Sequence, residues 1–106
     1  MALVNARVAP AALTPTDLYT VPVNTQLVVA YIGVANRGAN SDFNIAIRPN
    51  GAVLANPHYI YFEHDLVATS GVEIMKGTCL NAGDVITVQG KSANFSFNMF
   101  GELLDV

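Results

Sequence analysis

The chain has 106 residues, of which 52% are hydrophobic and only 12% are charged, and its formal net charge is -3. The length suits one domain with a single modest core, but about half of the surface charge usual for a soluble domain is missing. The five basic residues are scattered along an acidic chain, which excludes nucleic acid as the main partner because phosphate binding needs clustered cations.

The N-terminal residues 1–16 are expected to form an extended arm. Small apolar residues are interrupted there by Pro10 and Pro15, so neither a helix nor the apolar core of a signal peptide is expected. The arm is either a frayed terminus or a strap that docks on a neighbouring subunit. A strap would use its apolar side chains as assembly contacts: Leu3, Val4, Val8 and Leu13.

Residues 17–106 have the pattern of one β domain. Short apolar runs alternate with turn signals such as Pro49-Asn50-Gly51, and no window of eleven residues has a sustained helical period. Strands are expected at 17–21, 26–36, 43–48, 58–64, 72–75, 85–89 and 95–100. This spacing predicts an all-β fold, a single antiparallel β-sandwich or jelly roll that follows the extended arm.

The run 26–36 is apolar at both even and odd positions. Such a strand is expected to be buried on both sides, either within an assembly or at a subunit contact. Val28 and Ile32, on the second of its two faces, are therefore further candidate assembly contacts. Together with the missing charge, this run indicates a chain whose surface is largely covered by other protein.

The sequence gives no positive evidence for catalysis. The serines lie in no Gly-x-Ser-x-Gly elbow, and the acidic residues form no calcium loop. His58 and His64 would lie about 20 Å apart along one strand, too far to share a metal ion within one chain. One histidine from each of three copies could meet on a threefold axis, which the sequence does not require. We therefore expect no enzyme activity, no cofactor and no metal.

The cysteine and two of the tyrosines each allow two interpretations. Cys79 is the only cysteine, so it is either a small buried apolar side chain or a partner in a disulfide between copies. Tyr59 and Tyr61 lie at alternate positions of one expected strand and form a candidate ligand face, because tyrosine is favoured in glycan sites and interfaces. Strand propensity alone also accounts for both tyrosines.

Several segments in a fixed order resemble a small module found in tailed bacteriophages. Each segment alone is only a strand with a turn, so the resemblance depends mainly on the order of the segments. The segments are 18–29 (LYTVPVNTQLVV) with 32–37 (IGVANR), 43–51 (FNIAIRPNG), 58–61 (HYIY), 80–88 (LNAGDVITV) and 95–101 (FSFNMFG).

Similar chains are small virion structural proteins, and the resemblance spans about residues 17–104. It implies a non-enzymatic virion protein, made in the host cytoplasm, that assembles with itself and with other virion proteins. The role would be capsid decoration or cement, or a tail-fibre or baseplate component, without nucleic acid or membrane as a partner. The alternative is a carbohydrate- or receptor-binding module at a fibre tip that contacts a host surface glycan.

The C-terminal segments also resemble the closing strands of trimeric jelly rolls of the C1q and tumour-necrosis-factor type. In those proteins a Leu-x-x-Gly-Asp turn, here residues 80–84, precedes a strand. A Phe-rich strand then ends in Gly and two leucines, here residues 101–104. The resemblance implies a jelly roll and a homotrimer. The middle strands do not match, so a signalling function is not implied.

Overall fold

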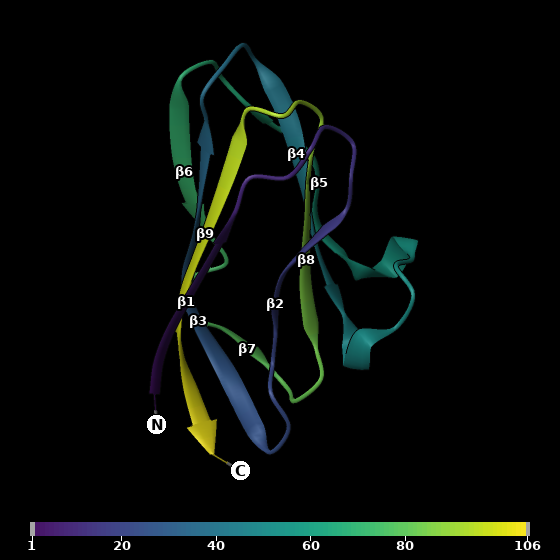
Figure 1. Ribbon diagram of the computed structural model, residues 1–106, viewed down its shortest axis with the longest axis vertical. Coiled ribbons are helices and arrows are strands. Elements are labelled where there is room, and N and C mark those ends of the chain that lie inside the picture. Colours follow the sequence, from purple (N-terminus) through teal and green to yellow (C-terminus); the bar gives the residue numbers. More distant parts are fainter. Residues whose placement is uncertain (1, 106) are drawn as a thin grey trace.

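The computed structural model describes residues 2–105, which fold into two antiparallel sheets packed face to face (Figure 1). In sheet A the strand order is β1-β9-β3-β6, with the short β7 also paired to β3, and in sheet B it is β2-β8-β4-β5. The strands are β1 (Ala2–Val8), β2 (Thr16–Thr20), β3 (Thr25–Asn36), β4 (Ser41–Arg48), β5 (Tyr59–Leu66), β6 (Ser70–Ile74), β7 (Thr78–Leu80), β8 (Val85–Gly90) and β9 (Phe95–Asp105). Most connections cross between the sheets, as in a jelly roll, so the predicted all-β fold is confirmed.

The core lies between the sheets and is built from alternate residues of each strand. Phe43 on β4 meets Phe95 and Phe97 on β9 with ring centroids 5.7 Å and 5.9 Å apart, and all three side chains are fully buried. Such aromatic pairs add to the free energy gained from burying their area. Two short 3-10 turns, η1 (Pro49–Gly51) and η2 (Asn56–His58), lie in the connection from β4 to β5.

Part of the expected N-terminal arm, residues 2–8, is a strand of the sandwich itself. Ala2–Val8 is a strand of sheet A, paired in regular register with β9 from Ala2 opposite Leu103 to Val8 opposite Phe97. Val4, Ala6 and Val8 pack against the core, while the residues between them point away from it. This alternation of inward apolar and outward residues is what makes the segment a strand. Residue 1 lies outside the described residues.

Within one copy, residues 26–36 are buried on one side only, and a β-bulge explains why both even and odd positions are apolar. Burial of the other side at a subunit contact stays a prediction. In the pairing of β3 with β9, Val29 lies opposite Gly101 and Tyr31 lies opposite Phe100, which leaves Ala30 as an extra residue. The bulge reverses which positions face the core. Leu27 and Val29 point inward before it and Ile32 and Val34 after it, so the even and odd apolar positions serve the same face.

Candidate functional site

The outer face of sheet A is a broad surface that no other part of residues 2–105 covers with a layer of its own (Figure 1). Its centre is an aromatic pair, Tyr31 on β3 and Phe100 on β9, with ring centroids 5.0 Å apart. Both residues are only half-buried. The bulge at Ala30 creates this pair, because it turns Tyr31 outward to the side on which Phe100 lies.

A shallow groove runs beside this aromatic pair. Small residues form its floor, namely Gly33, Ala35 and Gly71, and the side chains of Glu73, Asn98 and Phe100 border it. Because the floor residues carry at most a methyl group, the backbones of β3 and β6 are accessible from this side. The groove carries one charged side chain, in keeping with the low charge of the whole sequence.

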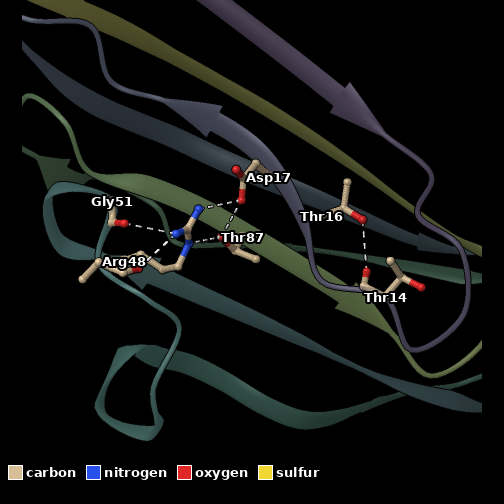
Figure 2. Close-up of polar contacts among 7 residues, drawn as sticks. Thr14, Thr16, Asp17, Arg48, Gly51 and Thr87 are labelled. Atoms are coloured by element: carbon tan, nitrogen blue, oxygen red, sulfur yellow. Dashed lines mark hydrogen bonds and ion pairs between the residues drawn. The ribbon is translucent and has the colours of Figure 1, made fainter.

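The outer face of sheet B is different, because the chain covers part of it with its own polar network (Figure 2). The guanidinium of Arg48 donates hydrogen bonds to Asp17 Oδ1 at 2.9 Å, Thr87 Oγ1 at 3.0 Å and the Ala52 carbonyl at 3.0 Å. Thr87 Oγ1 in turn donates to Asp17 Oδ1 at 3.0 Å. The network ties together β2, β8, β4 and the connection that follows β4, and it leaves Thr87 only 5% exposed.

The six expected assembly contacts divide into four groups. Leu3 and Leu13 are 85% and 65% exposed, which leaves them free for a partner. Val4 and Val8 pack against the chain's own core, and Val28 is half-buried on the outer face of sheet A. Ile32 is fully buried between the sheets, so it is a core residue and its expected role as a contact is wrong.

Tyr59 and Tyr61 do not share a face as the alternation predicts. Two bulges interrupt the pairing of β5 with β4, one between the partners of Phe43 and Ile45 and one between the partners of Ile45 and Ala46. Tyr61 therefore packs partly against the core, on the same side as Phe43. Tyr59 points the other way.

Beside Tyr59 lies a surface pocket that strict alternation along the strand does not predict. Asn56, Tyr59 and Phe62 line it, and the Tyr59 and Phe62 rings meet at an interplanar angle of 70° with centroids 4.9 Å apart. Phe62 is 59% exposed and the adjacent Ile60 is 54% exposed. No charged residue lines the pocket. The bulges brought these side chains together, and periodicity alone does not reveal them.

Cys79 is exposed, so its interpretation as a buried apolar side chain is wrong. It lies on β7 opposite Val28, on the outer face of sheet A. Because β7 belongs to sheet A, the side of β7 that carries Cys79 is part of the outer face that no layer covers. The other interpretation, a disulfide between copies, stays a prediction.

The strand pairing of sheet B places two carboxylates opposite each other although they are far apart in the sequence. Asp42 on β4 lies directly opposite Asp65 on β5, and Lys91 Nζ approaches Asp42 at 3.8 Å. Like charges opposite one another on paired strands are destabilising.

On the far edge of the same sheet, burial raises the pKa of the Tyr19 phenol above its usual value of 10.0.

Comparison of the chain with protein-family models, with curated proteins and with solved structures finds no match. Within residues 2–105, no group of three or more His, Cys, Asp or Glu side chains is placed to hold a metal ion. No helix in the same range is long and apolar enough to cross a membrane. The candidate site therefore rests on the surface chemistry of the two sheets.

Proposed function

We propose that the chain is a non-enzymatic structural protein of a tailed-phage virion, which assembles with itself as a homotrimer and docks on other virion proteins. The observation that carries the proposal is the contrast between the two outer faces. Arg48 and its partners cover part of sheet B, whereas sheet A presents half-buried Tyr31 and Phe100 beside a groove floored by small residues.

Self-assembly would work by burial of this face. Covering Tyr31, Phe100 and Val28 removes apolar area from water at about 25 cal/mol per Å², and few charges have to be desolvated to do so. In a particle with many copies, each weak contact is repeated, so a modest interface suffices. The phage setting comes from the sequence resemblance and the low charge.

The native Cys79 provides a direct test, because it is exposed on the proposed interface. In an oligomer that buries sheet A, the rate of maleimide labelling should fall as protein concentration rises, alongside the mass measured by light scattering. A matched control moves the thiol to the 89% exposed Val53 with the double variant Val53→Cys, Cys79→Ser, and its labelling should not change. A monomer at all concentrations, or an oligomer with unprotected Cys79, contradicts the proposal.

The virion setting requires its own measurement. An epitope-tagged copy, labelled with gold in purified particles of the phage that encodes it, should appear on the particles in electron micrographs. Label over the head means capsid decoration or cement, and label on the tail or its tip means a fibre or baseplate component. Particles without label contradict a virion role.

A second candidate function, binding of a neutral host glycan, is favoured by the pocket of Asn56, Tyr59 and Phe62. Two aromatic rings at 70° offer apolar faces for the C–H groups of a sugar ring, and the Asn56 amide can both donate to and accept from its hydroxyls. Binding on a glycan array should disappear with Tyr59→Ala and Phe62→Ala. It should survive Val67→Ala, a change at a 63% exposed site that does not line the pocket. Absence of binding by the intact protein contradicts this function.

A further inference from the structure

A row of four residues crosses the whole outer face of sheet A and carries opposite charges at its two ends. Arg7 on β1 lies opposite Asn98 on β9, Asn98 lies opposite Gly33 on β3, and Gly33 lies opposite Glu73 on β6. Arg7 Nε donates to Asn98 Oδ1 at 3.1 Å, which directs the guanidinium along this face. Arg7 and Glu73 are both exposed, and neither takes part in the two ion pairs found among residues 2–105.

A second row, parallel to the first, ends in apolar or weakly polar side chains at both edges. Leu3 on β1 lies opposite Glu102 on β9, Glu102 lies opposite Val28 on β3, and Val28 lies opposite Cys79 on β7. Leu3 is 85% exposed, and Cys79 is exposed beside the half-buried Val28. The β1 edge thus carries a cation and a leucine, and the opposite edge carries an anion and an apolar surface.

The two rows are separated by a similar distance at both edges. Arg7 and Leu3 are four residues apart on β1, which corresponds to about 13 Å along a strand. At the other edge, Glu73 and Cys79 lie opposite Gly33 and Val28, which are five positions apart on β3 because the bulge adds one residue between them. A second copy placed beside the first, with its β1 edge against the β6 and β7 edge, therefore brings both complementary pairs together at once. Within one chain the two edges are separated by three strand spacings, about 14 Å, so neither pair can form internally.

The direction of the strands also fits such a contact. β1 is antiparallel to β9, and β9 is antiparallel to β3, which makes β1 parallel to β3. β6 and β7 are both antiparallel to β3. A rotation about an axis parallel to the strands therefore sets β1 of one copy antiparallel to β6 and β7 of the next. The edges of sheet B suit this less well, because β2 and β5 both contain bulges, which hinder pairing with another strand.

We propose that copies of this chain associate head to tail, with the β1 edge of one copy against the β6 and β7 edge of the next. Arg7 pairs with Glu73 of the neighbour, and Leu3 packs on its Val28 and Cys79. This inference rests on the proposed function, in which the chain self-assembles through sheet A. The edge contact covers Leu3, Val28 and Cys79, and it leaves Tyr31 and Phe100 on the open face for a further partner. A head-to-tail contact uses two different surfaces, so it does not give an isologous dimer. It gives a ring such as a homotrimer when the rotation between successive copies closes.

Disulfide trapping tests the contact, with Leu3→Cys as the variant. Because Leu3 is 85% exposed, its replacement should leave the fold intact. After mild oxidation, the new thiol should join the native Cys79 of the neighbour, and non-reducing gels should show a ladder that ends at the size of the ring. The double variant Leu3→Cys, Cys79→Ser should give no ladder. A Val53→Cys variant, which keeps Cys79, is the control for random collision.

Each outcome separates the two proposals. Dimers of equal yield from Leu3→Cys with and without Cys79→Ser mean a symmetric β1–β1 contact and overturn the head-to-tail arrangement. An oligomer that forms no disulfide overturns the arrangement but leaves self-assembly through sheet A intact. A wild-type protein that stays monomeric at every concentration overturns the proposed function, and the inference with it.

Charge exchange tests the polar pair independently. Arg7→Glu and Glu73→Arg should each weaken self-association on the order of tenfold, because each places like charges at the contact. The double variant Arg7→Glu, Glu73→Arg should restore association to within about threefold of wild type. An equal mixture of the two single variants also reports the ring size. In a ring with an even number of copies the two variants can alternate, so every contact joins opposite charges. A ring of three copies must contain at least one contact between like charges, so it should form less well. Single variants that associate like wild type overturn the pairing.

Discussion

Gly101 on β9 lies so close to Val28 on β3 that a Cβ atom at position 101 would stand 2.7 Å from the Val28 carbonyl oxygen. The close approach occurs where the bulge at Ala30 brings an extra residue of β3 past its partner strand. The bulge in turn presents Tyr31 to Phe100. The missing side chain at Gly101 therefore allows the bulge, and the bulge places Tyr31 beside Phe100 on the outer face of sheet A.

Gly101→Ala should destabilise the protein by about 2 kcal/mol, because the new methyl group meets backbone that cannot rotate away. Urea unfolding followed by circular dichroism measures this change. Gly33→Ala is the matched control on the same sheet, since its Cβ would meet nothing nearer than 3.9 Å. Equal stability of the two variants would mean that the close approach at position 101 imposes no constraint.

Arg48→Met should lower the free energy of unfolding by about 2 kcal/mol, because it leaves Asp17 and Thr87 without their charged donor. The connection from β4 to β5 should also become sensitive to protease, because Arg48 holds the Gly51 and Ala52 carbonyls. Lys91→Ala is the control. Its ion pair with Asp42 at 3.8 Å is largely exposed on the lysine side, so the change should stay within about 0.5 kcal/mol.

Asp65→Asn should stabilise the protein by about 0.5 kcal/mol, since it removes one of two carboxylates that lie opposite each other on β4 and β5. Thermal unfolding at low ionic strength is the measurement. The gain should shrink in 1 M salt, where screening already reduces the repulsion from Asp42. A variant less stable than wild type would show that Asp65 makes a favourable contact that outweighs this repulsion.

The fold class could be predicted from the sequence because short apolar runs and turn residues recur along residues 17–106, and a sandwich needs little else. The prediction that failed was that side chains alternate strictly between the two faces of each strand. Each bulge shifts the side-chain pattern by one position, and no residue type marks the shift at Ala30 or Ile60. For this reason strict alternation places Ile32 at a contact and Tyr59 and Tyr61 on one face, whereas the structure buries Ile32 and separates the two tyrosines.

The rows across sheet A could not be predicted from the sequence either. Arg7 and Glu73 are 66 positions apart, and only the register of β1, β9, β3 and β6 places them at opposite ends of one row. Register depends on which strands pair, which a single sequence leaves open. The low charge of the chain did point to a covered surface, but it did not say which one.

The deletion of residues 2–8 should damage the fold, in contrast to what a detachable arm would allow. Val4, Ala6 and Val8 pack against the core, and their loss should cost about 3 kcal/mol. The deletion also leaves β9 as an unprotected edge, so aggregation should rise during thermal unfolding followed by light scattering. Val53→Asp is the control, because this 89% exposed side chain contributes nothing to the core and lies outside the proposed contact, so the variant should unfold like wild type. A truncated protein with unchanged unfolding would mean that β1 is dispensable for the sandwich, as expected of an arm whose role lies only in assembly.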